Sequence, residues 1–335
     1  MAMVVSPFQS EILAAVDSEL RQCVDAAFTG KPEEFKRMIY YSLGWDAKTK
    51  SAGKRLRPLL LLEVNHALGG EWQLALPAAA AVELVHNFSL VHDDIQDRSP
   101  TRRGKKTVWV KWGEAQAINA GDAMLAIANL EVLKLTEKDQ KDHLAAQILH
   151  QSTFDLTGGQ YLDLWFESAG DVLLEQYWQM VKGKTGALFR ACFELGALSA
   201  GVNITSLQDF GSLGERLGIA YQMQDDVLGI WGVETQLGKS IDNDLLARKK
   251  TYTVLYALGT STKFAQLWKT IPNFTLEDIQ AIRALMEDEG IKDHTVKMTD
   301  TLIHGIKEEI QLKFTDQKLR QDLEMTLEGL FDRHQ

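Results

Sequence analysis

The sequence is poor in the residues that cross-link chains, break helices or attract nucleic acid. Its 335 residues include two cysteines, Cys23 and Cys192, far apart in apolar helical stretches. No disulfide framework is expected, and both thiols are predicted to be buried and free in a reducing cytosol. The six prolines leave every long periodic segment uninterrupted. A formal net charge of −10 argues against nucleic acid as a partner.

Long apolar runs are absent as well. The N-terminal stretch reaches Glu11 and Asp17 too soon for the apolar region of a secretory signal. No uncharged apolar run reaches the roughly 18 residues that cross a bilayer. No transmembrane segment is therefore expected and the protein is predicted to be cytoplasmic, which leaves peripheral contact with a membrane open.

Alternation with a period of two, the pattern of strands, is nearly absent. The best strand candidate is the short stretch TVWVKW at 107–112. Helical periodicity dominates instead, as in residues 8–28, where apolar side chains recur every four residues. The sequence predicts an all-α fold, a bundle of long, mostly antiparallel helices around a central cavity. Because no stretch resembles a linker, residues 1–335 are expected to form a single domain.

The stretch HDDIQDRSPTRRG, from 92 to 104, carries the densest group of charges. On a helix Asp93 and Asp97 lie one turn apart on one face, with Asp94 beside them. Carboxylates this close repel one another unless a cation lies between them, and hard oxygen ligands suit Mg²⁺. Arg102 and Arg103 follow directly, and guanidinium groups match phosphate oxygens. The alternative is a solvated acidic helix end followed by a basic turn.

A second acidic pair strengthens the metal hypothesis. Asp225 and Asp226 follow another apolar helical run, and Lys239, Lys249 and Lys250 come after them. Two acidic clusters on separate helices, each followed by cations, can face one another across a cavity. Together they could hold several Mg²⁺ ions and one diphosphate.

In this arrangement the chain resembles the trans-isoprenyl diphosphate synthases of the polyprenyl synthetase family, and its pattern is most similar to the geranylgeranyl type. The resemblance implies the isoprenoid synthase fold, a homodimer, and Mg²⁺-dependent condensation of isopentenyl diphosphate with an allylic diphosphate (dimethylallyl, geranyl or farnesyl). The matching stretches, in family order, are GKRLRP at 53–58, ELVHNFSLVHDDIQD at 83–97, TRRG at 101–104, GQYLD at 159–163, KTGAL at 184–188, YQMQDD at 221–226, GKSIDND at 238–244 and KKT at 249–251.

The same resemblance implies a role for individual residues. Isopentenyl diphosphate would be bound by Lys54, Arg57, His86 and Arg103. The allylic diphosphate would be bound by Arg102, Lys184, Thr185, Gln222, Lys239 and Lys249. Two or three Mg²⁺ ions would be held by Asp93, Asp94, Asp97, Asp225 and Asp226. Gln160 and Asp163, three apart on one helix, would lie near the metal and the allylic substrate.

Two residues before the first acidic motif bear on product length. Phe88 and Ser89 stand five and four positions before Asp93, about one turn below the predicted metal site. In the family a bulky residue there closes the hydrocarbon tunnel, and an aromatic followed by a small residue resembles synthases that stop at C20. Simple core packing of Phe88 is the alternative.

One position departs from the family pattern. Where the second motif usually has a third carboxylate, this chain has Gly229, and Asp244 is expected to contribute only a further water-mediated or indirect contact. A weakly active subunit of a heteromeric synthase therefore stays open as an alternative. A class I terpene cyclase is a second one, although it has no use for the cations at 53–58. A purely structural bundle would not require cations after both acidic motifs.

Overall fold

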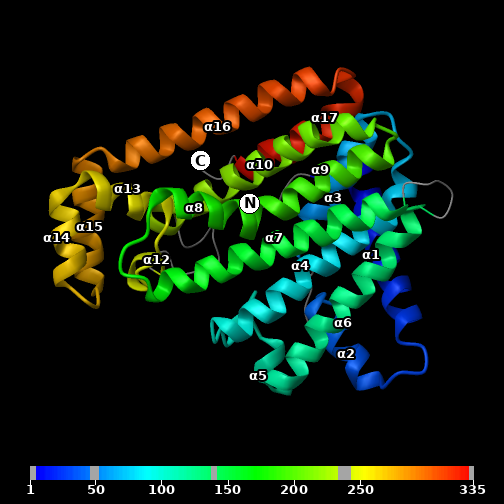
Figure 1. The fold of residues 1–335 in the computed structure, drawn as a ribbon, viewed down its shortest axis with the longest axis horizontal. Coiled ribbons are helices and arrows are strands. Elements are labelled where there is room, and N and C mark those ends of the chain that lie inside the picture. The colour runs from blue at the N-terminus through cyan, green and yellow to red at the C-terminus, as the bar shows by residue number, and fades with distance from the viewer. Residues whose placement is uncertain (1–4, 46–52, 137–141, 233–242, 332–335) are drawn as a thin grey trace.

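The computed structural model describes residues 5–45, 53–136, 142–232 and 243–331, and over these residues the protein is a bundle of α-helices (Figure 1). The first half contains α1 (Pro7–Ala27), α2 (Glu33–Ser42), α3 (Leu56–Ala67), η1 (Trp72–Ala75), α4 (Leu76–Gln96), β1 (Thr101–Arg102), β2 (Lys105–Lys106), α5 (Val108–Trp112), α6 (Glu114–Leu133), η2 (Lys134–Thr136) and α7 (Asp142–Ser168). The second half contains α8 (Leu174–Val181), η3 (Lys182–Gly186), α9 (Ala187–Ser199), α10 (Ile204–Trp231), α12 (Asn243–Leu246), α13 (Tyr252–Thr260), α14 (Thr262–Thr270), α15 (Leu276–Asp288), α16 (Ile291–Lys313) and α17 (Gln317–Phe331). The all-α prediction is confirmed.

The first predicted helix is confirmed as α1. Its N-terminus is fixed by a reciprocal pair: the Ser6 hydroxyl accepts a hydrogen bond from the Gln9 amide at 3.0 Å, and the Gln9 side chain accepts one from the Ser6 amide. Ile12, Val16 and Leu20 recur every four residues and are fully buried. The apolar stripe read from the sequence is therefore the face that packs on the bundle.

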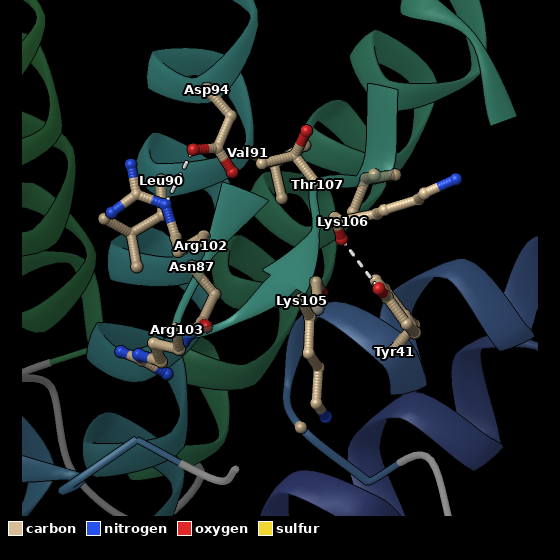
Figure 2. A pocket seen from close by; sticks show the side chains of 13 residues that line it. Tyr41, Asn87, Leu90, Val91, Asp94, Arg102, Arg103, Lys105, Lys106 and Thr107 are labelled. Atoms are coloured by element: carbon tan, nitrogen blue, oxygen red, sulfur yellow. Dashed lines mark hydrogen bonds and ion pairs between the residues drawn. The ribbon is translucent and has the colours of Figure 1, made fainter. Parts of the chain in front are cut away.

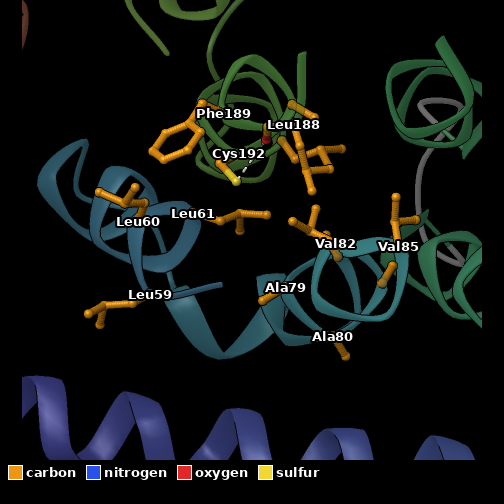
Figure 3. Packing of buried hydrophobic residues seen from close by; sticks show 14 of the residues in the cluster. Leu59, Leu60, Leu61, Ala79, Ala80, Val82, Val85, Leu188, Phe189 and Cys192 are labelled. Atoms are coloured by element: carbon orange, nitrogen blue, oxygen red, sulfur yellow. Dashed lines mark hydrogen bonds between the residues drawn. The ribbon is translucent and has the colours of Figure 1, made fainter. Parts of the chain in front are cut away.

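The centre of the bundle is formed where α3, α4 and α9 pack together. Figure 3 shows Leu61 of α3, Ala79 and Val82 of α4 and Cys192 of α9 directed toward one another. Alanines on α4 let the helices approach closely, so the helix that carries the first acidic motif is held on a packed core. Both cysteines are buried and free, as predicted, and burial raises the pKa of the Cys192 thiol to about 12.

The strand prediction at 107–112 is wrong, because this stretch forms the short helix α5. Thr107 adopts an extended conformation at the start of the helix, and Gly113, with φ of 88°, ends it. The Trp109 indole donates a hydrogen bond to the carbonyl of Ser99 at 2.8 Å. Tertiary contacts of the large aromatic residues outweigh the β propensity of so short a segment.

A short β-hairpin with a two-residue turn precedes α5. Thr101 pairs with Lys106 and Arg102 with Lys105, and the turn between the strands is formed by Arg103 and Gly104. Both turn residues have positive φ, 52° and 74°. This is the conformation that a tight hairpin turn requires, and it directs two successive arginines to different neighbours.

The C-terminal helices cover the bundle. Thr275 and Asp278 form a capping box at the start of α15. In Figure 1 α16 runs along α10, and α17 lies beside α3. A second apolar cluster, which includes Ile230 and Phe264, joins the end of α10 to α13, α14 and α15. A single domain over the whole chain stays a prediction.

Within the described residues, one helical stretch is long and apolar enough by composition to cross a membrane. It is Trp72–Gln96, which contains α4, and 67% of its most apolar window is buried in the protein. Such burial is typical of a central core helix, and it agrees with the packing of α4 described above.

Candidate active site

The first acidic motif lies at the C-terminal end of α4. Arg102, on the hairpin, reaches back to it: Nε donates to Oδ1 of Asp94 at 2.7 Å (Figure 2). Nη2 of Arg102 lies 3.2 Å from Oδ2 of Asp93. Asp97 ends the helix, and burial, with the nearby charge of Asp93, raises the pKa of Asp97 to about 6. The repulsion between these carboxylates is therefore relieved by a protein cation.

A second cation reaches the motif from the turn η3, which is π-helical. The ammonium of Lys184 pairs with Asp163 and lies 3.7 Å from Oδ1 of Asp93. The same Asp93 oxygen accepts a hydrogen bond from Gln160 at 2.8 Å. A side chain at Gly159 would clash with the backbone of Lys184, so glycine is required for this approach of α7 to η3. The predicted pair Gln160 and Asp163 does lie at the first motif.

The second acidic motif lies on α10 and is held by neutral donors. Asp226 is buried and accepts hydrogen bonds from the Tyr177 hydroxyl at 2.6 Å, the Gln222 amide at 2.9 Å and the Tyr252 backbone at 3.1 Å. Burial nevertheless raises the pKa of Asp226 to about 6. Asp225, its neighbour, is exposed.

The two motifs meet at η3. Lys184 faces Asp93 of the first motif, and the next residue, Thr185, donates a hydrogen bond to Gln222 at 3.0 Å. Gln222 in turn donates to Asp226. One turn of backbone thus links carboxylates that stand more than a hundred residues apart in the sequence, while their opposition across a cavity stays a prediction.

Lys249 belongs to the same group. Burial works against its charged form, but the carboxylates of Asp244, Asp163, Asp226 and Asp225 together raise the pKa of Lys249. Its ammonium makes no hydrogen bond or ion pair with the side chains of the described residues. A permanent cation held in this field is suited to an anionic ligand such as a diphosphate. The predicted ligand Lys239 lies outside the described residues.

A separate group of cations lies below the first motif. Nη1 of Arg57 is 3.2 Å from Nε2 of His86. Burial lowers the pKa of His86 well below its ordinary value, and Arg57 and Arg103 add to the shift. Because Arg57 can only donate, the neutral imidazole accepts at Nε2 and carries its proton on Nδ1. Arg103 joins this group and packs against Gly53, where an added Cβ would lie only 2.6 Å from Nη1 of Arg103.

The cations of the stretch at 53–58 have different surroundings. Arg55 is buried and forms ion pairs with Glu83 at 2.8 Å and Asp17 at 3.2 Å. It also donates to the carbonyl of Leu43 at 2.8 Å. Lys54 is exposed beside it. Arg55 therefore anchors α3 to α1 and α4, which leaves Lys54 and Arg57 as the substrate-binding candidates from this stretch.

A small pocket lies behind the hairpin, between α2 and α4 (Figure 2). Its volume is about 50 Å³, and its lining includes the carboxylate of Asp94 and four cations of the hairpin, Arg102, Arg103, Lys105 and Lys106. A space of this size holds a few water molecules and no diphosphate. It does show how strongly basic the surroundings of the first motif are.

The predicted chain-length residues lie one turn below the first motif. Phe88 is 9% exposed, belongs to the main apolar core, and its ring meets His92 edge-on with centroids 5.0 Å apart. Ser89 donates its hydroxyl to the carbonyl of His86 at 2.8 Å. His92 packs closely against Gly121 of α6 and so supports the contact between α4 and α6. Phe88 is therefore a buried core residue one turn before Asp93, and its role in product length stays a prediction.

The donor set fits Mg²⁺ in its chemistry. Within the described residues no three acidic, histidine or cysteine side chains converge on one point, because Arg102 and Lys184 occupy the first motif. Mg²⁺ usually takes only one or two protein carboxylates and completes its shell with water and phosphate oxygens. Carboxylates that already face the same turn from α4 and α10 meet that requirement.

Sequence reasoning missed one member of this site. Tyr177 of α8 is fully buried and holds Asp226, and the burial raises the pKa of its phenol well above the ordinary value. It stands in no recognisable motif, so only the fold brings it to α10. The one available signal was that it is a tyrosine, because a tyrosine that the fold buries needs a hydrogen-bond acceptor for its hydroxyl.

Known proteins resemble this chain over most of its length. Residues 37–288 match the family model for polyprenyl synthetase. A (2E,6E)-farnesyl diphosphate synthase of Mycobacterium bovis is 40% identical over 229 residues, which are 66% of this chain and 63% of that protein. A geranylgeranyl diphosphate synthase of Mycobacterium tuberculosis is 39% identical over 77% of this chain and 76% of its own.

A solved structure agrees with both comparisons. The geranylgeranyl pyrophosphate synthetase of Pyrococcus horikoshii superposes with a TM-score of 0.83 at 31% identity, and the match covers 97% of this chain and 99% of that one. The matched segment of this chain spans less than two thirds of the farnesyl relative, but the family match covers both acidic motifs. The chain belongs to the polyprenyl synthetase family.

Proposed function

We propose that this protein is a Mg²⁺-dependent prenyltransferase that condenses isopentenyl diphosphate with an allylic diphosphate. The observation that carries the proposal is the turn η3, through which Lys184 faces Asp93 while Thr185 is hydrogen-bonded to the second motif. A second, separate cationic group around Arg57 and His86 supports binding of a second diphosphate.

The allylic diphosphate would bind between the acidic motifs. Mg²⁺ would be held there by Asp93, Asp94, Asp97, Asp225 and Asp226, and when bound it offsets the charge of the departing diphosphate. Arg102, Lys184 and Lys249 contribute fixed positive charge on the same side, and Thr185 and Gln222 keep η3 in register with α10. As the allylic C–O bond breaks, its electron pair leaves with the diphosphate.

Isopentenyl diphosphate would be held by Lys54, Arg57, His86 and Arg103. The Nδ1–H of the neutral His86 and the guanidinium of Arg57 are hydrogen-bond donors suited to phosphate oxygens. The double bond of this substrate attacks the allylic carbon, a new C–C bond forms, and a proton lost to the departed diphosphate restores an alkene. An apolar lining is needed to keep water from the cation.

We propose C20 as the product, since Phe88 with Ser89 resembles the pattern of synthases that stop there. Relatives at nearly equal identity are named farnesyl and geranylgeranyl diphosphate synthases, so product length rests on these residues. The test is incubation with isopentenyl diphosphate, Mg²⁺ and each allylic primer in turn, with chain-length analysis of the products. Elongation of no primer would reject the proposal, and a cyclic hydrocarbon from one substrate would favour a terpene cyclase.

We propose that the protein acts as a homodimer. Supporting this, α6 and α7 carry exposed apolar side chains, including Ile118 (46% exposed), Leu130 (64%) and Phe154 (74%). Light scattering after size-exclusion chromatography should give twice the chain mass. A monomer that elongates only after a partner subunit is added would favour the heteromeric alternative.

A further inference from the structure

The second acidic motif has Gly229 where the family pattern has a third carboxylate, and another side chain occupies the space beside this glycine. A Cβ built on Gly229 would clash with Oδ2 of Asp244 and lie 3.1 Å from its Cγ. The carboxyl group of Asp244 therefore occupies the volume into which a side chain at position 229 would project. Asp244 comes from α12, a separate segment that packs across the end of α10.

The position of Asp244 is fixed on both sides. The next residue, Leu245, is fully buried and belongs to the same apolar cluster as Ile230, the neighbour of Gly229. The backbone amide of Lys249 donates to the Asp244 carbonyl at 2.8 Å. A buried anchor and a backbone hydrogen bond thus hold the half-buried carboxylate against α10.

The charge of Asp244 acts inside the candidate site. Among the carboxylates around Lys249, Asp244 has the largest influence on the ammonium, ahead of Asp163, Asp226 and Asp225. It therefore faces the same space as the first two members of the second motif. Glycine at 229 is what allows this approach, because any larger residue would displace the carboxylate.

We infer that Asp244 supplies, from a different segment of the chain, the third carboxylate that Gly229 omits, and that it completes the set of oxygens facing the diphosphate-bound cations. The inference rests on the proposed function and deepens it. It also explains how the site can keep a third carboxylate although the acidic sequence of α10 is incomplete.

The test moves the carboxylate back. With Asp244→Ala, the Cβ of residue 244 lies 3.7 Å from a Cβ at position 229, an ordinary contact, so Gly229→Asp fits in this background. The readout is Mn²⁺ uptake with inorganic diphosphate, measured by the loss of the free Mn²⁺ signal in electron paramagnetic resonance. We expect Asp244→Asn and Asp244→Ala to weaken Mn²⁺ uptake by about tenfold or more.

The double variant Gly229→Asp with Asp244→Ala should recover Mn²⁺ affinity to within about threefold of wild type. Gly229→Asp alone should bind Mn²⁺ more weakly than wild type, because two carboxylates then compete for one space. Wild-type uptake by the isosteric Asp244→Asn, or a double variant no better than Asp244→Ala, would overturn the inference. Wild-type protein that takes up Mn²⁺ with diphosphate but elongates no primer would reject the proposed function alone.

Discussion

The two acidic motifs face the same turn, yet they are built in opposite ways. In the first, Asp93 and Asp94 are paired with the cations Arg102 and Lys184. In the second, Asp226 is buried among neutral donors and its carboxylate is fixed by three hydrogen bonds. The carboxylates of the first motif form ion pairs, whereas the buried carboxylate of the second is fixed by hydrogen bonds from uncharged donors.

The difference suggests a division of labour. Ion pairs to half-exposed arginine and lysine side chains exchange readily, because an arriving diphosphate can take over the cations while Mg²⁺ takes the carboxylates. A buried carboxylate with three hydrogen-bond partners has no such freedom, and removing one partner leaves an unsatisfied group in the interior. The first motif can therefore rearrange around the ligand, whereas the second provides a fixed wall.

The largest effect should come from breaking the first motif. Asp94→Ala removes a carboxylate that contacts Arg102 and is expected to hold metal, so turnover should fall roughly 10³-fold. The melting temperature should change little, because Arg102 is half-exposed and keeps its ion pair with Asp93. Steady-state kinetics and thermal unfolding measure both. Asp300→Ala, on the exposed face of α16, is the matched control, and near-normal turnover of Asp94→Ala would refute the metal assignment.

A smaller effect should follow from loosening the second motif. Tyr177→Phe deletes one donor to Asp226 and leaves the ring in place, so turnover should fall about 10- to 100-fold. The KM for isopentenyl diphosphate should be unchanged, because that group of cations lies elsewhere. Tyr256→Phe is the control, since its ring stacks on His294 away from Asp226. Equal losses in both tyrosine variants would mean that Tyr177 is only a packing residue.

The region below the first motif gives a test of product length. Phe88→Ala should lengthen the main product, because it removes the bulky ring one turn before Asp93 that we propose as the end of the hydrocarbon tunnel, and Phe88→Leu should give an intermediate distribution. Both variants lose stability, by about 3–5 kcal/mol for the alanine. Phe210→Ala, an equally buried ring at the α10–α16 contact, controls for that loss. An unchanged product of Phe88→Ala would show that the floor lies elsewhere.

The sequence could predict the parts of this site that depend on helical spacing and motif order. Asp93, Asp97 and Gln160 lie where their periodicity and family motif put them, because long amphipathic helices carry their spacing into the fold. The strand predicted at 107–112 was wrong, since tryptophan contacts outweighed local propensity. Contacts between segments were out of reach: nothing local brings Tyr177 to Asp226.

The stretch at 53–58 illustrates the same limit. Its arginines look alike in sequence, but Arg55 is buried against Glu83 while Arg57 lies beside His86. Arg55 adopts a left-handed backbone conformation at the start of α3, with φ of 49°, and its side chain pairs with Glu83. The different surroundings of Arg55 and Arg57 cannot be predicted from composition or periodicity.

The smallest effect on activity, and a clear one on stability, concerns a buried carboxyl away from both motifs. Glu63 of α3 accepts hydrogen bonds from Gln9 of α1 and Thr326 of α17, each at 2.8 Å, and no cation among the described residues is paired with it. Burial raises the pKa of Glu63 to about 8 from an ordinary value of 4.5. The pKa of Glu63 is therefore that of a buried acid without the cations of the first motif and without the three hydrogen-bond donors of the second.

The folded state holds the proton of Glu63 more tightly than the unfolded state, so its contribution to stability is complete below pH 4.5. That contribution is lost progressively as the pH rises to about 8. Glu63→Gln should therefore leave the free energy of unfolding unchanged near pH 4.5 and increase it by a few kcal/mol at pH 8. Thermal unfolding across this range measures the effect, with Glu328→Gln, exposed on α17, as control. If the difference in unfolding free energy between wild type and Glu63→Gln did not change with pH, Glu63 would titrate normally. Neutral donors alone would then keep a buried carboxylate charged, and the distinction drawn between the two motifs would no longer hold.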